Sequence, residues 1–400
     1  MDGFPADSGW GSLLSVHYKP SRNSVSASGA QDFTMSARLL YIALICLYFP
    51  SNVQASCPTV PVKTRSFITR NCTSSILDNE IQDHLNSIIT TRVVPTIYTV
   101  AFFFGLPANG IALWVLTFRA KKMPSTTLLI NLAVADLLFM LALPFKITYY
   151  FMENNWIFGE SLCRIVTAVF YGNMYCSVLF LMAISIDRYI GLVHPFRARS
   201  LRDWRCSTCA SIGIWLVAIA AASVFAVVPQ TKCFDNPHRI TCNDIWASCS
   251  GYEWYRLYFL GLFAVGFAIP SVVTLLCYLL VLVMLVKKKE SFRRAIGLIS
   301  LVLIMFILCF TPSNIFLVLH YLAKSWEYHN QLYFWYVLAL SLTSLNSCID
   351  PFIYYYVSND FWTLVKDTLC NRKGNSMSSE STKKSKLTSS SEKEMLRSGS

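Results

Sequence analysis

The strongest constraint on how this 400-residue chain folds is a series of seven long apolar stretches. Each exceeds the roughly 20 residues that an α-helix needs to cross the hydrocarbon core of a bilayer. Because backbone polar groups in lipid must be satisfied internally, the expected fold class is an all-α membrane protein, a seven-transmembrane helix bundle over residues 93–357. We expect the spans near residues 93–118, 126–152, 160–190, 207–228, 253–287, 292–322 and 331–357.

The composition supports lipid as part of the solvent. Hydrophobic residues make up 54% of the chain and charged residues 14%, against roughly 25% charged residues in a soluble domain. This balance excludes a soluble multidomain protein, a disordered chain and a small disulfide scaffold. The net charge of +12 indicates basic cytoplasmic loops rather than a nucleic-acid surface, so no nucleic-acid partner is expected.

The segment before the first span has three predicted parts. Residues 35–55 combine a basic start, an apolar run and a Val-x-Ala ending, which is typical of a secretory signal peptide. Because such peptides begin at the chain terminus, we predict that Met35 is the initiator and that residues 1–34 are an upstream extension. The alternative is a genuine leader with an internal anchor. Residues 56–92 then form a polar extracellular segment.

Basic residues orient the bundle. They cluster after the first, third and seventh spans and between the fifth and sixth, which places the N-terminus outside and the C-terminus inside the plasma membrane. Residues 358–370 are predicted to form a short amphipathic helix on the inner leaflet. Cys370 at its end is either a palmitoylation site or a plain thiol. Residues 371–400, rich in Ser, Thr and Lys, are expected to be a disordered tail.

Ionisable residues within apolar spans are costly to bury, so each one is a functional candidate. The sequence singles out Asp136, Asp350 and the pair Asp187-Arg188. They belong to an ordered series of motifs: Gly105-x-x-x-Asn109, Leu132-x-x-x-Asp136, Cys163, Asp187-Arg188-Tyr189, Trp215, Pro270, Phe306-x-x-Cys309-Phe310-x-Pro312 and Asp350-Pro351-x-x-Tyr354. In this order and at these spans, the series resembles the rhodopsin-like (class A) G-protein-coupled receptors across about residues 93–370.

This resemblance implies an activation switch. Arg188 would hold the inactive state through Asp187 and would then be released to meet a heterotrimeric G protein. The set would comprise Asp187, Arg188, Tyr189, Tyr278, Phe306, Phe310, Pro312, Asp350, Pro351 and Tyr354.

The resemblance also implies an allosteric sodium ion, since a hard cation favours clustered oxygens. The alternative is that the Asp136 or Asp350 carboxyl stays protonated and hydrogen-bonded. No other cofactor, no metal centre and no enzymatic activity are expected. The sodium site would comprise Asp136, Ser177, Asn346 and Asp350.

Departures from the general pattern narrow the class of receptor. Phe310 replaces the usual Trp of the sixth span, and Asp350 replaces the usual Asn of the seventh. No Lys lies in residues 331–357, which excludes an opsin, and no Asp lies in the outer half of the third span, which argues against an amine ligand. The segments that resemble the protease-activated receptors are 170–175, 241–244, 309–314, 320–321 and 344–352, and residues 59–64 and 243–249 favour the type-3 branch.

Trypsin-like cut sites lie in the extracellular segment. A serine protease with an acidic primary pocket requires Arg or Lys before the scissile bond. Cleavage after Arg65 would expose a tethered ligand that resembles the agonist of the thrombin receptor. Cleavage after Lys63 would instead expose Thr64 and fits the type-3 branch better. The Arg65 product would begin Ser66, Phe67, Ile68, Thr69, Arg70, Asn71.

The new α-amino group would be largely charged near neutral pH and would need an acidic partner, for which Asp244 and Glu253 are candidates. A flexible leash of about 20 residues would reach about 25 Å, which allows the ligand to fold back. Acidic residues at 78–83 would either dock a basic exosite of thrombin or form a solvated face. The resemblance places Tyr171, Asp244, Glu253, Tyr321, Tyr333 and Tyr336 in the pocket.

Six of the fourteen cysteines lie in predicted extracellular segments, where disulfides form. The resemblance implies a disulfide between Cys163 and Cys242. A second disulfide would join Cys233 to Cys249. A third, between Cys57 and Cys72, would bracket the cut site, which is a less usual arrangement. Asn71 begins an N-glycosylation sequon, Asn-Cys-Thr, within the presumed ligand.

The sequence therefore predicts a receptor that an extracellular serine protease such as thrombin activates by unmasking a tethered agonist. Its partners would be that protease, a G protein, arrestin, receptor kinases and membrane lipid. The alternatives are a class A receptor for a diffusible nucleotide, lipid or peptide, and a protease-docking co-receptor. A transporter is disfavoured because no internal repeat is visible.

Overall fold

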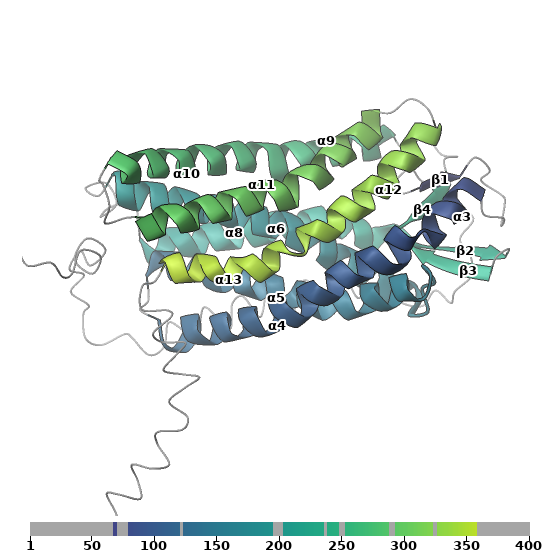
Figure 1. Ribbon diagram of the computed structural model, residues 1–400, viewed down its shortest axis with the longest axis horizontal. Helices are drawn as coiled ribbons and strands as arrows, with labels where there is room; N and C mark the ends of the chain where they lie inside the picture. The colour runs from purple at the N-terminus through teal and green to yellow at the C-terminus, as the bar shows by residue number, and fades with distance from the viewer. Residues whose placement is uncertain are drawn as a thin grey trace, which may run out of the picture.

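The computed structural model describes residues 67–69, 79–120, 123–194, 203–235, 238–247, 253–287, 293–322 and 326–357. Long helices run side by side along the molecule, and short strands gather at one end (Figure 1). We call this end the strand end. The remaining predictions on residues 1–66, 70–78 and 358–400, including the signal peptide, the amphipathic helix and Cys370, lie outside the described residues.

Within the described residues, seven helical spans are long and apolar enough to cross a membrane, which confirms the predicted fold class. The fifth span contains a π-helical turn and the seventh has a short break, so each is divided into labelled parts. The helices are α4 (Val94–Phe118), α5 (Pro124–Phe151), α6 (Gly159–Val193), α8 (Trp204–Val227), α9 (Glu253–Phe263), η2 (Ala264–Ala268), α10 (Ile269–Lys287), α11 (Arg293–Leu322), α12 (Trp326–Thr343) and α13 (Asn346–Val357).

Local sequence explains where several helices start and bend. Pro124 is the first residue of α5, a position where the missing N–H costs nothing. Pro107, Pro144, Pro312 and Pro351 lie inside helices, where neighbouring membrane helices compensate for the lost hydrogen bond. Gly105 lets α4 approach α5 closely, because a Cβ there would lie 2.6 Å from the Met140 Cε atom.

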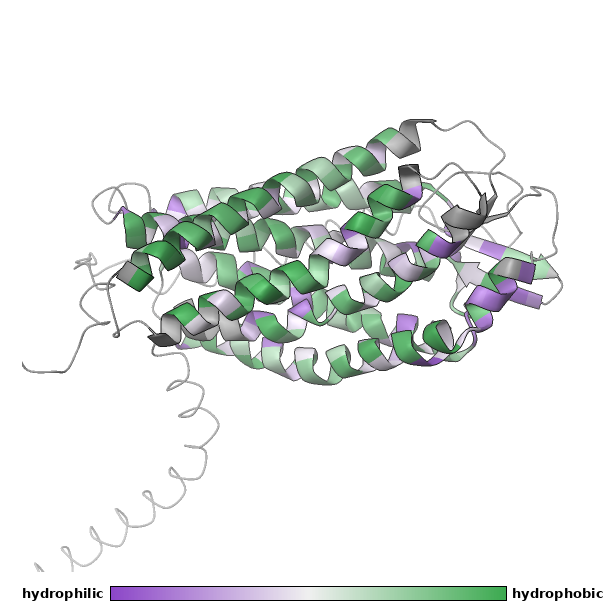
Figure 2. Cartoon of the chain, turned by 45° about the horizontal axis from the view of Figure 1, so that its top comes forward, coloured by the Kyte–Doolittle hydropathy of each residue, from purple (hydrophilic) through white to green (hydrophobic). Residues whose placement is uncertain are grey.

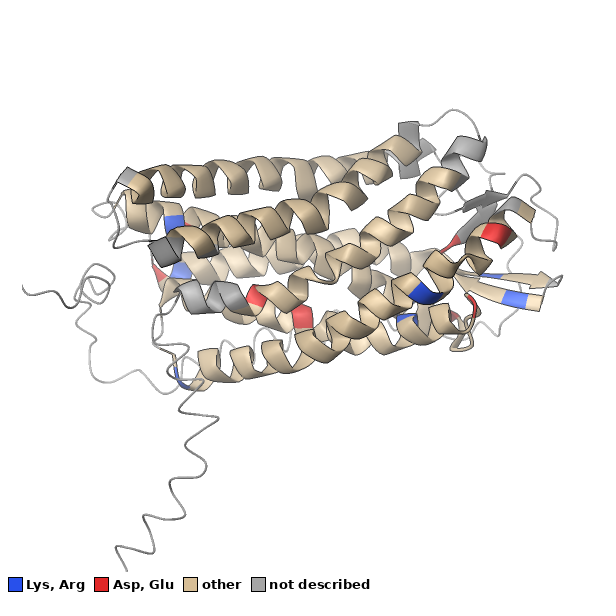
Figure 3. Ribbon diagram, in the orientation of Figure 1, with Lys and Arg blue, Asp and Glu red and all other residues tan. Residues whose placement is uncertain are grey.

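The bundle has apolar side chains on its outside as well as its inside. Phe103, Phe104 and Leu257 are 67–70% exposed on α4 and α9, and hydrophobic residues cover the length of the helices (Figure 2). Charged residues gather mainly towards the two ends (Figure 3). This distribution is the one expected when lipid surrounds the middle of a helix bundle.

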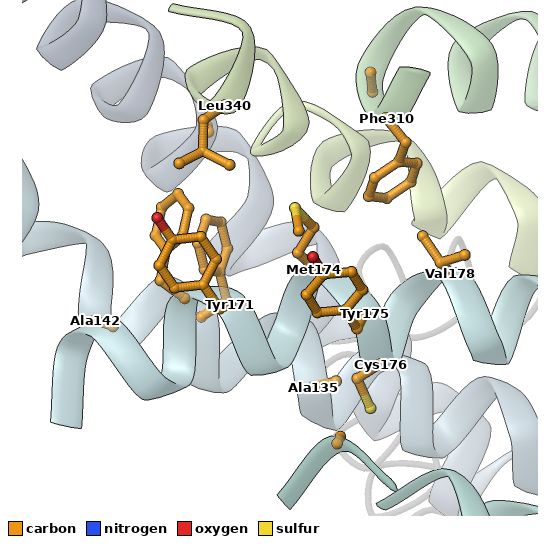
Figure 4. Packing of buried hydrophobic residues seen from close by; sticks show 14 of the residues in the cluster. Ala135, Ala142, Tyr171, Met174, Tyr175, Cys176, Val178, Phe310 and Leu340 are labelled. Carbon is orange, nitrogen blue, oxygen red and sulfur yellow. The ribbon is translucent and has the colours of Figure 1, made fainter. Parts of the chain in front are cut away.

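The interior is closed by aromatic and aliphatic side chains from facing helices. In Figure 4, Tyr171 of α6 points towards Leu340 of α12, and Val178 of α6 points towards Phe310 of α11. Tyr171, Val178 and Phe310 are at most 3% exposed. α6 therefore lies at the centre of the bundle and connects the strand end to the opposite end.

Two small sheets cover the strand end. β2 (Thr231–Asp235) pairs antiparallel with β3 (His238–Cys242), and β1 (Phe67–Thr69) pairs parallel with β4 (Ile245–Ala247). A disulfide joins Cys163 of α6 to Cys242 of β3, with 5.8 Å between the Cα atoms. The predicted disulfide is thus confirmed, and it fixes the β2–β3 hairpin to the bundle. The Cys233–Cys249 pair stays a prediction, since residue 249 lies outside the described residues.

A helix that the sequence analysis did not predict precedes the first span. α3 (Asn79–Asn86) is followed by a π-helical turn, η1 (Ile89–Val93). Ile81 and Leu85, one helical turn apart, are 0% and 1% exposed. The predicted flexible leash is therefore wrong for residues 79–93, because the apolar face of this short helix is buried. Ile81 is also not accessible to a protease exosite.

Polar contacts hold α3 in place. The Asn154 amide donates to the Leu85 carbonyl at 2.7 Å, and Arg239 of β3 donates to the Asn86 side chain at 3.0 Å. The His84 ring packs against Phe334 of α12, with 5.0 Å between ring centroids. The chain before the first span is thus anchored to the turn after α5, to β3 and to α12.

Replacing both Cys163 and Cys242 with Ser is expected to lower the free energy of unfolding by about 4–5 kcal/mol, because the disulfide closes a long loop. The matched control replaces Cys206 and Cys209, two exposed thiols of α8, with Ser. The measurement is the midpoint of thermal unfolding in lipid nanodiscs. Equal midpoints for the two double variants would contradict the expectation.

Candidate functional site

A pocket lies at the strand end between α4, α5, α6, α12 and the segment that joins β3 to β4. The space between its lining atoms is about 300 Å³, and part of it is open to solvent. The lining combines aromatic rings with one carboxylate and one ammonium group, a composition suited to a ligand that is both apolar and charged. The lining residues are Tyr98, Lys146, Tyr150, Thr167, Phe170, Tyr171, Asn243, Asp244, Tyr333, Val337 and Leu340.

Asp244 is the pocket's acidic group. It is 4% exposed, and its Oδ1 atom accepts a hydrogen bond from the Tyr333 hydroxyl at 2.9 Å. Tyr149 of α5 also lies beside it. A carboxylate so far from bulk water attracts any cation that reaches it, because the surroundings screen charge weakly.

The turn before β4 aims Asp244 into the pocket. Asn243 has a φ of 65°, a left-handed conformation that Asn adopts more readily than most residues. Its backbone N–H donates to the Gln230 carbonyl at 2.8 Å, and its side chain donates to the Tyr171 hydroxyl at 3.2 Å. These bonds hold the turn between the hairpin and α6.

The structure brings most of the predicted pocket residues together. Tyr171, Asp244 and Tyr333 line the pocket. Tyr336 is buried and packs on the Tyr333 ring, with 5.8 Å between centroids, so it supports the lining from behind. Glu253 lies in α9 and residue 321 lies in α11, but both side chains are outside the described residues.

Lys146 is the main pocket residue that sequence reasoning missed. It lies in α5 and is 6% exposed, and its Nζ atom lies 5.6 Å from the Tyr149 ring centroid and 6.0 Å from that of Tyr150. These are cation–π distances. The cost of burying charge in a membrane span, which singled out the acidic residues, would have found this lysine as well.

β1 places three residues of the predicted tethered ligand beside β4, the strand that follows Asp244. In the register of the two strands, Phe67 is paired with Ile245, Ile68 with Trp246 and Thr69 with Ala247. Because the strands are parallel and Asp244 directly precedes Ile245, the N-terminal end of β1 lies at the Asp244 end of β4. β1 also contacts α12. The cut-site residues Lys63, Thr64, Arg65 and Ser66, and the ligand residues Arg70 and Asn71, are outside the described residues.

A second polar cluster lies midway along the bundle, between α5, α6 and α13. The Ser347 hydroxyl donates to the Asp136 carboxylate at 2.8 Å, and the Asn346 amide donates to Asp350 at 2.8 Å. Asp136 and Asp350 also contact each other. Ser177 and Asn173 of α6 complete the cluster around Asp136. The four residues of the predicted sodium site are thus brought together.

The opposite end of the bundle holds the predicted charge pair. The Asp187 carboxylate accepts a hydrogen bond from the Ser125 hydroxyl of α5 at 2.7 Å. The Arg188 Nη2 atom lies 3.8 Å from the same carboxylate oxygen. Tyr189 is hydrogen-bonded to the His194 ring at 3.1 Å. Ser125 was not predicted, and it ties the charge pair to α5.

The aromatic part of the switch lies in α11. The ring centroids of Phe306 and Phe310 are 5.4 Å apart, and these residues lie six and two positions before Pro312. The Asn314 amide donates to the Phe310 carbonyl at 2.9 Å, next to the point where the proline interrupts the backbone bonds. Tyr278 of α10 is 3% exposed. The side chain of residue 354 in α13 is outside the described residues.

Two comparisons with known proteins bear on this arrangement. A family model described as the seven-transmembrane receptor, rhodopsin family, matches residues 108–354. Proteinase-activated receptor 4 of Rattus norvegicus is 43% identical over 295 residues, covering 74% of this chain and 75% of that protein.

Two further relatives give similar values. Proteinase-activated receptor 3 of Homo sapiens is 40% identical over 283 residues, or 70% of this chain and 75% of its own. Proteinase-activated receptor 2 of Homo sapiens is 40% identical over 295 residues, which cover 72% of this chain and 74% of that protein. These identities do not separate the branches, so the type-3 assignment stays a prediction.

Tyr333→Phe is expected to lower the free energy of unfolding by about 1–3 kcal/mol, because it removes a donor from the buried Asp244 carboxylate. The control is Tyr258→Phe, which removes a hydroxyl that donates to the Ala221 carbonyl away from the pocket. The unfolding midpoint in nanodiscs measures both. A smaller loss for Tyr333→Phe than for the control would be inconsistent with this role of the hydroxyl.

Proposed function

Because the chain belongs to the rhodopsin-family seven-helix receptors and, within them, to the proteinase-activated receptors, we propose that an extracellular serine protease activates it by cleavage after Arg65. The new terminus at Ser66 acts as a tethered agonist in the pocket at the strand end, and the bundle then engages a heterotrimeric G protein. In this account the strand end faces outward and the protein resides in the plasma membrane, with its C-terminus inside.

The pairing of β1 with β4 is the single observation that carries this proposal. It aligns Phe67 with Ile245, the residue directly after Asp244. Cleavage after Arg65 leaves the new ammonium group one residue before Phe67, close to the register position of Asp244. Cleavage after Lys63 would leave it three residues before Phe67, roughly 7 Å further along an extended chain.

Charge supplies the driving force. The intact chain offers a neutral peptide bond at the cut, whereas the cleaved chain offers an α-ammonium group. Asp244 is buried and has one acceptor oxygen, Oδ2, without a hydrogen bond among the described residues. An ammonium group that binds this oxygen satisfies a buried carboxylate, and such charge-assisted bonds are stronger than neutral ones.

The anchored helix α3 supports the tether. With residues 79–86 and 89–93 helical, the linker between β1 and α3 is residues 70–78. A shorter linker whose ends are already near each other keeps the ligand at high effective concentration. The ligand can therefore have weak intrinsic affinity and still occupy the pocket after cleavage.

Signalling requires a second state that the bound ligand favours. The Asp187 contacts with Ser125 and Arg188 suit the inactive state, in which the arginine side chain is withheld from the G protein. Ligand contacts with α12 and the β4 segment would shift α11 and α12, and through them α13 and the polar cluster. Arrestin, receptor kinases and membrane lipid are further proposed partners, through the Ser/Thr-rich tail and Cys370.

The cleavage proposal is tested by calcium release in cells that express residues 35–400 and are treated with thrombin or trypsin. Arg65→Ala is expected to abolish the response, and Lys63→Ala, the matched control, is expected to retain it. Loss of the response in Lys63→Ala, with the response retained in Arg65→Ala, would indicate cleavage after Lys63 instead. A response in the double variant equal to that of the wild type would refute cleavage at either bond.

Loosening α3 is expected to separate tethered from soluble agonism. Leu85→Asp places a charge in a fully buried position and should release the helix. The protease response should weaken by at least about tenfold in potency, because the effective concentration of the ligand falls. The response to a soluble hexapeptide amide with the sequence of residues 66–71 should stay within about threefold. Asn79→Ala, at an exposed position of the same helix, is the control, and an equal loss with both agonists would argue against anchoring.

The sodium site is proposed at the polar cluster of Asp136, Ser177, Asn346 and Asp350. Replacing NaCl by choline chloride at constant ionic strength should raise the potency of the hexapeptide amide, because the ion stabilises the inactive bundle. Asp136→Asn should remove this salt effect, since it removes one of the two carboxylates. An unchanged sodium effect in Asp136→Asn would exclude this site.

A further inference from the structure

We propose that Lys146 is the internal counter-ion of Asp244 and that the ammonium group of the tethered ligand replaces it, which makes Lys146 a determinant of ligand specificity. The inference rests on the proposed function, which supplies the ligand. It assigns to the lysine two effects: it keeps the pocket electrically neutral before cleavage, and it repels any ligand whose amine does not reach Asp244.

The two groups share one pocket and are enclosed to the same degree. Lys146 projects from α5, and Asp244 comes from the segment between β3 and β4. Both line the pocket, and they are 6% and 4% exposed. Among the described lining residues, they are the two that normally carry a full charge, one of each sign. A single buried charge would be costly, whereas two opposite charges in one cavity offset each other.

The lysine is held near the carboxylate without being locked to it. Its ammonium group lies against the Tyr149 and Tyr150 rings, and Asp244 is the charged group that acts on it. In the described part of the chain, the ion pairs with nitrogen and oxygen within 4.0 Å are Arg164–Glu160 and Arg188–Asp187. Lys146 and Asp244 thus attract each other across the pocket, and Asp244 Oδ2 accepts no hydrogen bond from the described residues.

This geometry suits exchange of one cation for another. The aromatic rings continue to stabilise the lysine when the carboxylate turns to a new partner, because the faces of tyrosine rings attract cations. The new ammonium group can approach the unoccupied oxygen while Tyr333 continues to donate to the other. The intact chain has a peptide bond at the same point and cannot make this exchange.

The repulsive side of the interaction gives specificity. A ligand with a blocked amine leaves Asp244 paired with Lys146 and adds no charge, so it gains little. A ligand with a free amine is attracted by the Asp244 carboxylate and repelled by the Lys146 ammonium group. Discrimination therefore depends on both charges, as expected when selectivity combines an attractive and a repulsive element.

The test uses full-length receptor in cells and two soluble peptides, the hexapeptide amide of residues 66–71 and its N-acetylated form. Lys146→Met removes the charge and keeps the length of the side chain. We expect the potency of the free-amine peptide to rise about tenfold and that of the acetylated peptide to fall. The potency ratio, free-amine over acetylated peptide, should therefore increase by more than tenfold. Lys146→Arg should leave the ratio near that of the wild type. Lys232→Met, in β2 away from the pocket, is the control.

Asp244→Asn provides the second arm. In that background, Lys146→Met should change the potency ratio by less than about threefold, because residue 244 no longer carries a carboxylate for which Lys146 and the ligand amine compete. If Lys146→Met alone does not reach the cell surface, the double variant is expected to restore surface expression, since it removes both buried charges. An unchanged or reduced ratio in Lys146→Met, or a failure of the double variant to restore expression, would overturn the proposal.

Failure of the proposed function would look different. If neither peptide activates the wild-type receptor, the tethered-ligand mechanism fails, and the counter-ion assignment is then judged by unfolding midpoints alone. Lys146→Met and Asp244→Asn should each lower the midpoint more than the double variant does. Additive losses would overturn the counter-ion assignment as well.

Discussion

The cost of burying charge away from water governs the parts of this structure that matter for function. The helices satisfy their own backbone groups, so the bundle can be apolar on its outside and inside alike. Every charged side chain left inside must then have a partner. Asp244 has Tyr333 and the nearby Lys146, Asp136 has Ser347, and Asp187 has Ser125 and Arg188. In each case at least one partner comes from a different element.

Contacts between different elements are a feature that the three sites share. A charge pair that spans two elements is broken or formed when those elements move, so each site can report on the arrangement of the bundle. The pocket joins the β4 segment to α5 and α12, the middle cluster joins α5 to α13, and the third site joins α6 to α5. A ligand that changes the first site can therefore bias the other two through α12, α13 and α6.

The spans could be predicted because long apolar runs are local signals. The Cys163–Cys242 disulfide and the gathering of the polar-cluster residues were implied by the resemblance to the rhodopsin-like receptors that the ordered motifs carry. Helix α3 was missed because its apolar face consists of two residues, Ile81 and Leu85, within a polar segment. The pairing of β1 with β4 joins positions far apart in sequence, and three-residue strands carry no periodic signal. Lys146 lies in an apolar span but belongs to none of the ordered motifs, so the sequence did not single it out.

The central claim is that cleavage delivers an ammonium group to Asp244. A cryo-electron microscopy structure of the protease-cleaved receptor bound to a G protein tests it most directly. We predict that the Ser66 nitrogen lies within about 3 Å of an Asp244 carboxylate oxygen, with Lys146 displaced from its position over the Tyr149 and Tyr150 rings or further from the carboxylate. A Ser66 nitrogen in solvent or paired with Glu253, with Lys146 and Asp244 unchanged, would contradict the account.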